Sequence, residues 1–388
     1  MFNVDICTDY IPSYLDKNYI LVNAAVFSNI NDKDEIQYIS EKIIESLTNN
    51  DRTKIAFNGI SEGIPYNQFI SINNILNFLI DNFSFNPKNC CIMSGAIPDI
   101  KNLIYYKEHC KRFNWIEVPI IFVNWWEQHF NVKLLEKDSI YNSITTSPRI
   151  KQKKFICYNR NTKPHRLYIT TQCIKRDLLK DAYFSNYFRF PMDVMNFNCT
   201  HEWLPTLCTD IHDTMYENYK LFPIDLGLAQ IPWNEQTDHF MGVTNDDVNY
   251  FEESYFGVIT ESKYAHDNYS IKNQIHGQLS LDCYIFTEKT FKFIAAKKPF
   301  LLAGFTGSLQ MLRNFGYKTF HPYIDESYDS MNNDEERIIA IVNEIERLCN
   351  LTDDEWLEWQ KNVEPIMLHN YNILKNAGET VFKHVPIF

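Results

Sequence analysis

Residues 284–320 read YIFTEKTFKFIAAKKPFLLAGFTGSLQMLRNFGYKTF and contain the pattern that decides the fold. Thr287 opens an apolar run with helical spacing, and residues 299–303 form a short apolar run closed by a glycine turn, which predicts a helix followed by a buried strand. The start of a helix offers unpaired N–H groups and partial positive charge to a phosphate, and Lys289 adds a full charge there. The stretch therefore predicts an α/β fold with a phosphate site where the helix begins.

The N-terminal half alternates short apolar runs with amphipathic ones. Its apolar runs predict strands over residues 20–27, 54–57, 90–93 and 118–123, and its helical spacing predicts helices over residues 34–47, 72–83 and 100–113. This alternation implies a parallel sheet covered by helices on both faces.

The second half starts afresh after residues 131–154, whose charge, Ser/Thr content and Pro148 indicate a linker. Strands are predicted over residues 155–158, 255–259 and 299–303, and helices over residues 164–179, 308–315, 337–348 and from 352 to beyond 366. Ser308, Asn333 and Thr352 are the expected N-caps. Residues 186–250 show little periodicity and predict loops with short helices.

The fold class that follows is α/β, with two Rossmann-like domains and an interdomain cleft. The expected domains are residues 1–150 and 151–365, with residues 366–388 as a helix or tail that packs back on the first domain. Ligands of such sheets bind beyond the carboxyl ends of the strands, so both domains are expected to contribute residues.

Composition narrows the class of protein. The chain has 388 residues, a formal net charge of −12 and ten cysteines without a CxxC pair. Nucleic-acid binding is disfavoured because an acidic protein is repelled by a polyanion, although Lys151–Lys154 and Lys297–Lys298 could supply a local basic patch. Scattered cysteines, no leader-like start and no long apolar run predict a cytoplasmic protein without a membrane span.

Three elements of the second half carry a family resemblance. Residues 286–292, FTEKTFK, with Pro299-Phe300 after them, resemble the donor-binding motif of fucosyltransferase-like and exostosin-like glycosyltransferases of the GT-B architecture, where a [Y/F]-x-T-E-K signature meets the sugar nucleotide. Residues 155–160 with His165-Arg166, and residues 257–261, look like the two elements that precede this signature. Residues 286–329 also look like viral and bacterial glycosyltransferase-like proteins. Phe293 departs from the smaller residue expected in the fucosyl enzymes, which leaves the sugar open.

The resemblance covers roughly the C-terminal 230 residues, about the length of one domain. It implies a GT-B arrangement in which residues 1–150 bind the acceptor and residues 151–365 bind a nucleotide-sugar donor. The donor-binding residues that it implies are Arg160, Arg166, Thr260, Glu261, Thr287, Glu288 and Lys289.

The chemistry of glycosyl transfer assigns roles to these side chains. The leaving group is a diphosphate, so Lys289 and Arg166, with Arg160 as a further cation, are expected to neutralise its growing charge in place of a metal ion. Glu288 is expected to accept hydrogen bonds from ribose hydroxyls. Surface ion pairing is the alternative for the cations, and complementing the helix dipole is the alternative for Glu288.

The acceptor hydroxyl must lose a proton, so a base is expected in the first domain. Glu62 is the candidate, because it follows the strand that ends at Phe57. Asp5, Asp9 and Glu127 occupy similar positions, and a capping role for Glu62 is an alternative. Trp125 and Trp126 are expected to stack on an acceptor sugar, with burial in a core as the alternative.

Other chemistries lack their motifs. The His/Asp groupings at residues 210–213 and 238–239 do not have metal-ligand spacing, so no metal site and no cofactor besides the sugar nucleotide is expected. The chain contains no G-x-S-x-G elbow, P-loop or G-x-G-x-x-G fingerprint.

The sequence thus predicts a glycosyltransferase that moves a sugar from a nucleotide-diphosphate donor to a hydroxyl of a glycan or other acceptor, inverting and metal-independent by resemblance. One alternative is a viral enzyme that glycosylates a hydroxylated DNA base. The other is an inactive nucleotide-sugar or glycan-binding protein.

Overall fold

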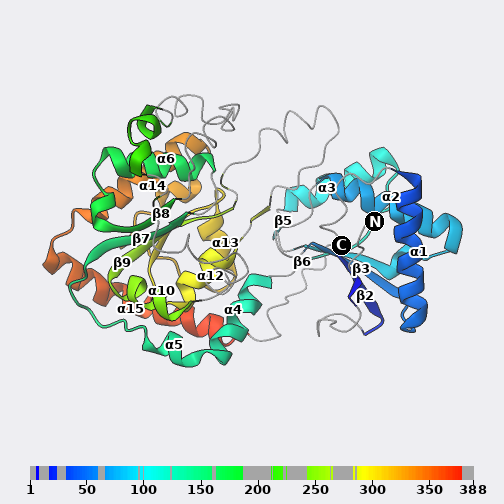
Figure 1. Ribbon diagram of the computed structural model, residues 1–388, viewed down its shortest axis with the longest axis horizontal. Helices are drawn as coiled ribbons and strands as arrows, with labels where there is room; N and C mark the ends of the chain where they lie inside the picture. The colour runs from blue at the N-terminus through cyan, green and yellow to red at the C-terminus, as the bar shows by residue number, and fades with distance from the viewer. Residues whose placement is uncertain are drawn as a thin grey trace. The chain divides into compact units, whose positions relative to one another are not determined.

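The computed structural model describes residues 6–7, 17–23, 32–59, 66–94, 97–98, 100–122, 125–159, 163–186, 211, 213–221, 224, 243–262, 264, 283–284 and 286–377 (Figure 1). The chain divides into two compact units. The first unit comprises residues 1–128, 267–285 and 379–388, and the second comprises residues 129–266 and 286–378. The domain limits expected from the sequence, at residues 150 and 365, stay predictions.

The first unit is built on a five-stranded sheet in the order β1-β2-β3-β4-β6. Its strands are β1 (Ile6–Cys7), β2 (Tyr19–Asn23), β3 (Lys54–Gly59), β4 (Cys90–Ser94) and β6 (Ile120–Phe122). β1 is antiparallel to β2, and the other neighbours are parallel. A separate antiparallel pair joins β5 (Ile97–Pro98) to β10 (Cys283–Tyr284).

Helices α1 (Lys33–Asn49), α2 (Tyr66–Phe83) and α3 (Ile100–Phe113) accompany this sheet, with a 3-10 turn η2 (Pro87–Asn89) before β4. α1 begins where Asp32 accepts hydrogen bonds from the N–H groups of Asp34 and Glu35. Its apolar positions, spaced three or four residues apart, are buried in a core that the strands share. The predicted strands and helices of this half are confirmed for the described residues.

The second unit is built on a parallel four-stranded sheet in the order β11-β9-β7-β8. Its strands are β7 (Lys153–Asn159), β8 (Ala182–Asn186), β9 (Ser254–Thr260) and β11 (Phe300–Ala303). The chain places β8 on one side of β7 and then returns to place β9 on the other. The strand order therefore reverses at β7, which makes the carboxyl ends of β7 and β9 a topological switch point.

Helices cover both faces of this sheet. They are α6 (Pro164–Lys175), α10 (Asn245–Glu252), α12 (Glu288–Ala295), α13 (Ser308–Asn314), α14 (Asp334–Cys349) and α15 (Asp353–Lys375), with 3-10 turns η3 (Leu179–Asp181), η4 (Tyr219–Leu221) and η5 (Ser327–Ser330). In Figure 1, α6 and α14 lie above the sheet and α10, α12 and α15 below it, in agreement with the contacts of α14 with α6 and of α12 with α15.

The last helix is fixed at its start. Thr352 and Glu355 form a reciprocal capping box, as the sequence predicts. Trp356, fully buried, stacks on Tyr255 of β9 with ring centroids 4.0 Å apart. This aromatic contact ties α15 to the central strand of the sheet.

Gly257 of β9 leaves room for the bulky side chain of Phe293 on α12. A Cβ atom at Gly257 would lie 2.0 Å from Cε1 of Phe293 on α12, so only glycine lets the ring of Phe293 pack on the strand. The large side chain at Phe293 and the glycine at residue 257 thus form one packing unit.

Two expectations about local structure are wrong, and one strand was missed. Much of the expected linker is helical, because α4 (Trp125–Glu136) buries Phe130 and Leu134 at helical spacing and is followed by α5 (Asp138–Ser143). β8 was not expected, whereas α10 begins within residues 186–250, where short helices were expected. The N-cap of α13 is Gly307, whose φ of 81° suits glycine, and Ser308 is the first helical residue.

The α/β class with two Rossmann-like sheets is confirmed, and the GT-B arrangement with its cleft stays a prediction. Among the helices of the described residues, none has both the length and the apolar character needed to cross a bilayer.

Candidate functional site

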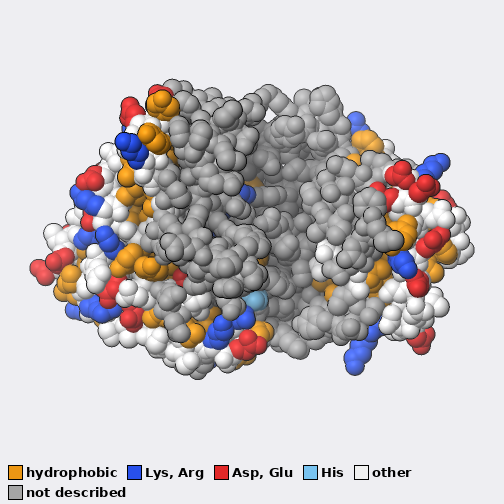
Figure 2. All heavy atoms as spheres, in the orientation of Figure 1, with side chains coloured by type: hydrophobic (Ala, Val, Ile, Leu, Met, Phe, Trp, Pro, Cys, Tyr) orange, Lys and Arg blue, Asp and Glu red, His pale blue; other side chains and the backbone are white. Residues whose placement is uncertain are grey.

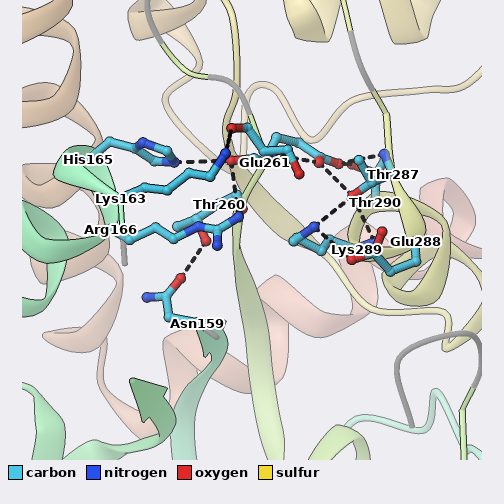
Figure 3. Close-up of polar contacts among 11 residues, drawn as sticks. Asn159, Lys163, His165, Arg166, Thr260, Glu261, Thr287, Glu288, Lys289 and Thr290 are labelled. Carbon is cyan, nitrogen blue, oxygen red and sulfur yellow. Dashed lines mark hydrogen bonds and ion pairs between the residues drawn. The ribbon is translucent and has the colours of Figure 1, made fainter. Parts of the chain in front are cut away.

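The candidate site lies at the carboxyl ends of β7 and β9 in the second unit (Figure 3). Asn159 is the last residue of β7, and Thr260 is the last residue of β9. The hydroxyl of Thr260 donates to Oδ1 of Asn159, and both residues are 1% exposed. Polar side chains so deeply buried at a switch point form the floor of the region where sheets of this type bind ligands.

Basic residues at the start of α6 converge on the end of β9. Nη2 of Arg166 donates to the carbonyl oxygens of Thr260 and Glu261, at 3.0 and 3.3 Å. Nζ of Lys163 donates to the carbonyl of Ser262. Pro164 occupies the first position of the helix, where its missing N–H needs no partner. The basic side chains of Lys163 and Arg166 lie on either side of this proline in the sequence. Arg166 is only 3% exposed, so its charge is held inside the site.

His165 is held neutral in this cluster. Burial lowers the pKa of His165 well below its usual value, and the nearby charges of Arg166, Lys163 and Arg337 lower it further. Its Nε2 lies 3.0 Å from the carbonyl oxygen of Glu261, so the neutral ring donates its Nε2–H there. The ring stacks on Tyr264 with centroids 5.1 Å apart.

The carboxylate of Glu261 anchors the start of α12. Oε1 accepts hydrogen bonds from the N–H of Thr287 at 3.0 Å and from the hydroxyl of Thr290 at 2.6 Å. Oε2 accepts from the hydroxyl of Thr287 at 2.7 Å and from the N–H of Ser262 at 3.3 Å. Four donors converge on a side chain that is 1% exposed, so Glu261 joins strand β9 to helix α12.

Lys289 lies next to Thr287, which Glu261 holds, and is more exposed than Glu261. Its Nζ donates to the hydroxyl oxygen of Thr287 at 2.9 Å and to Oε1 of Glu288 at 2.7 Å. The side chains of Lys289 and Glu288 are each 19% exposed, so a ligand can reach both. The geometry places the two residues together as an ion pair at the first turn of α12.

Arg337, in the first turn of α14, contacts the chain segments that follow β9 and β11. Its guanidinium donates to the carbonyls of Gly304 and Tyr264 and pairs with Asp334 at 2.7 Å. The guanidinium carbon lies 3.8 Å from the ring centroid of Tyr264, and Arg337 is 1% exposed. Arg337 therefore ties the segments that follow β9 and β11.

Among the described residues, the site has more cations than carboxylates, although the whole protein is acidic. Its cations are Lys163, Arg166, Lys289 and Arg337, and its carboxylates are Glu261, Glu288 and Asp334. The helices α6 and α12 also point their N-termini at the end of β9, from opposite sides in Figure 3. Excess cations with two helix starts favour an anion.

A buried ion pair supports α12 from below. Nζ of Lys292 lies 3.0 Å from Oδ2 of Asp247 on α10, and the hydroxyl of Tyr158 donates to Oδ1 of Asp247 at 2.9 Å. Burial alone raises the pKa of Asp247, but Lys292 and the hydrogen bonds from Thr244 and Tyr158 outweigh it and lower the pKa. The carboxylate therefore stays ionised.

The structure brings together six of the expected donor-binding residues. They are Arg166, Thr260, Glu261, Thr287, Glu288 and Lys289. Glu62, Arg160, Asp5, Asp9 and the His/Asp groupings for which no metal site was expected, apart from Asp213, lie outside the described residues.

The tryptophans and the alternative base lie on α4. Trp125 and Trp126 start this helix in the first unit; the side chain of Trp125 is outside the described residues, and Trp126 is half-buried. Glu127, one of the alternatives to Glu62, is 3% exposed.

Three residues of the site were missed. Lys163 could have been found by the argument used for Lys289, because it also lies at the start of a helix: it is the N-cap residue of α6, which follows β7. Arg337 and Asn159 carry no local signal, since their partners are distant in sequence.

A pocket lies away from the candidate site, and no metal-binding cluster accompanies either of them among the described residues. A pocket of about 420 Å³, lined among others by Pro322, Tyr323 and Trp359, contains none of the site residues. In the described part of the chain, no three His, Cys, Asp or Glu side chains are grouped to hold a metal ion.

Comparison of the chain with models of protein families, with curated proteins and with solved structures finds no match.

Proposed function

We propose that the protein is a nucleotide-sugar-dependent glycosyltransferase whose second unit binds the donor diphosphate at the end of β9. The observation that carries the proposal is the pair of cationic groups on either side of Glu261. On one side, Lys163 and Arg166 donate to backbone carbonyls at the end of β9. On the other side, Lys289 donates to the hydroxyl oxygen of Thr287, and this hydroxyl in turn donates to the carboxylate of Glu261.

Two cationic groups match two phosphoryl groups. Each group combines a helix start with at least one basic side chain, and each such combination suits one phosphate. Because both groups are attached to one short segment of chain, a diphosphate that bridges them meets both at once. A monophosphate would meet only one.

The proposed reaction uses these charges on the leaving group. As the anomeric C–O bond breaks, negative charge grows on the diphosphate, and Lys289 and Arg166 stabilise it more strongly in the transition state than in the bound donor. The acceptor hydroxyl attacks the anomeric carbon from the opposite side, which inverts the centre. Glu62 is proposed to take the hydroxyl proton, and Glu288 to accept hydrogen bonds from the donor ribose.

For the alternative of a nucleic-acid acceptor, the lysines of the suggested basic patch all have partners within the chain. Nζ of Lys151, Lys153, Lys297 and Lys298 each donates to a backbone carbonyl, and Lys154 lies over the rings of Tyr255 and Trp356. On the face shown in Figure 2, basic and acidic side chains of the described residues are interspersed. These lysines keep their charge, but each is oriented by a contact within the chain, so they give no specific support to a positive track along a duplex.

Calorimetric titration with nucleoside diphosphates, their sugars and the matching monophosphates tests the proposal. We expect one diphosphate to bind at least tenfold more tightly than its monophosphate. Lys289→Met should weaken that binding about tenfold, the effect of losing one charged hydrogen bond. Lys42→Met, which removes an exposed cation of α1, is the control and should bind normally.

Turnover separates the enzyme from an inactive binding protein. Release of diphosphate from the bound sugar donor, with a panel of hydroxyl acceptors, is expected in the unmodified chain and lost in Glu62→Gln with donor binding kept. Binding of no nucleotide diphosphate at all would refute the proposal. Tight donor binding without turnover on any acceptor would favour the inactive binding protein.

A further inference from the structure

A second cluster of basic groups lies at the opposite, amino edge of the same sheet. It gathers Arg149 and Lys151, just before β7, with Lys298, just before β11, around the residues that lead into β9. None of these residues belongs to the site proposed above.

The carboxylates of this cluster are engaged by Arg149 rather than by the lysines. Arg149 lies 2.7 Å from Glu253 and 3.6 Å from Glu252, and Glu252 also accepts from the N–H of Thr145 at 3.0 Å. Arg149 thereby takes the negative charge that would otherwise pair with a lysine.

Each lysine is left with a backbone carbonyl. Nζ of Lys151 donates to the carbonyl of Glu252 at 2.6 Å, and Nζ of Lys298 donates to the carbonyl of Ser254 at 2.5 Å. These carbonyls are two residues apart, so the two amines are close neighbours. Lys298 is 6% exposed, whereas Lys151 is only partly buried.

We propose that Lys151 is a covalent modification site, at which its amine accepts an acyl group from an acyl thioester. The nitrogen attacks the thioester carbonyl carbon, an N–C bond forms, the C–S bond breaks and the thiolate leaves, while the amine releases a proton to water. The resulting amide keeps one N–H, which is enough to donate to the carbonyl of Glu252. The loss of charge removes a like-charge repulsion with Lys298 and Arg149.

The state of the amine supports this reaction. Burial lowers the pKa of Lys151 to about 8, helped by Arg149 and opposed by Glu253 and Glu252. Burial, with the charge of Lys151, also lowers the pKa of Lys298 well below its usual value, but Lys298 is too enclosed to meet a thioester. Only the neutral amine is a nucleophile, and Lys151 supplies it near neutral pH.

Acetylation by acetyl-coenzyme A, followed at each lysine by mass spectrometry of the full chain, tests the proposal. At pH 7 the neutral fraction of Lys151 exceeds that of a lysine with pKa 10.5 about 300-fold. A less basic amine attacks more slowly and Lys151 is partly covered, so we expect a net advantage of about tenfold. Lys42 and Lys180 are the internal controls, because pairing with Glu45 and Asp177 raises the pKa of each.

Arg149→Met provides the matched variant. Removing this cation and freeing two carboxylates both raise the pKa of Lys151, so its acetylation should slow at least about threefold at pH 7 while that of Lys42 is unchanged. Lys151→Gln should melt at or above the wild-type temperature, because the amide keeps a donor for Glu252 and the charge beside Lys298 and Arg149 is lost. Acetylation of Lys151 no faster than that of Lys42 in the wild-type chain, or an unchanged rate in Arg149→Met, would overturn the proposal.

Discussion

Replacing Glu261 by glutamine should destabilise the second unit even without a ligand. The carboxylate accepts from Thr287 and Thr290 over three hydrogen bonds of 2.6 to 3.0 Å, and the side chain is 1% exposed. Hydrogen bonds to a charged group contribute about 1.5 to 3 kcal/mol each, and an N-terminal cap about 1 kcal/mol. Glutamine keeps one oxygen and places an amide group against a hydroxyl, so we expect a loss of about 2 kcal/mol, and about 4 kcal/mol for Glu261→Ala.

Differential scanning calorimetry of the ligand-free chain measures this. For a unit of this size, 2 kcal/mol corresponds to a drop of about 4 to 8 °C in the melting temperature of its transition. Glu288→Gln is the matched control. It removes the neighbouring carboxylate, whose ion pair with Lys289 is partly exposed and contributes about 0 to 1 kcal/mol, so the melting temperature of this variant should fall by at most about 4 °C.

The same pair of variants separates two roles for Glu261. If its carboxylate held the donor instead of α12, Glu261→Gln would melt with the wild type and lose only nucleotide affinity. A melting temperature within 1 °C of the wild type, or an equal drop in Glu288→Gln, would refute the anchoring argument.

Three further substitutions probe the second unit. Gly257→Ala should unfold it or cost about 3 kcal/mol or more in a denaturant titration, because the new Cβ would lie 2.0 Å from the ring of Phe293; a stable variant would contradict this packing. Lys298→Met should raise the melting temperature at pH 7. Burial lowers the pKa of Lys298 in the folded chain, so its cost is fully present below that folded pKa and disappears as pH rises towards 10.5, and the advantage of the variant should shrink between pH 7 and 10. Thr352→Ala breaks the capping box with Glu355 and should cost about 1 kcal/mol, measured by the same denaturant titration; no change would show that the exposed cap is dispensable.

The sequence predicts most of the fold because most of its elements have a local cause. α1 has its apolar stripe and the strand β3 its apolar run, and both form where these patterns occur. The helix α4 was missed because charged residues hide two buried positions, Phe130 and Leu134, that only packing makes decisive.

In the candidate site as well, some features have a local cause in the sequence and others depend on residues that are distant in the sequence. Lys289 is predictable because a helix start is a local feature. The partners of Glu261 lie 26 and 29 residues away, and Arg166 reaches carbonyls 94 and 95 residues away. The parallel pairing of β7 with β9 brings Arg166 to its carbonyls, and the packing of α12 against β9 brings Thr287 and Thr290 to Glu261. No local pattern encodes either contact. Hence the sequence shows which residues carry charge, but not that the carboxylate of Glu261 is already occupied.

The attachment of both cationic groups to Glu261 has a mechanical consequence. Its carbonyl meets Arg166 and His165, while its carboxylate meets Thr287 and Thr290, so a shift of this one residue moves both arms of the proposed grip together. A ligand that engages both arms pays the entropic cost of immobilisation once, as a chelating agent does, and a ligand with a single anionic group gains nothing from the second arm. Selectivity for a diphosphate over a monophosphate would then depend on a single residue, Glu261, that connects the two cationic groups.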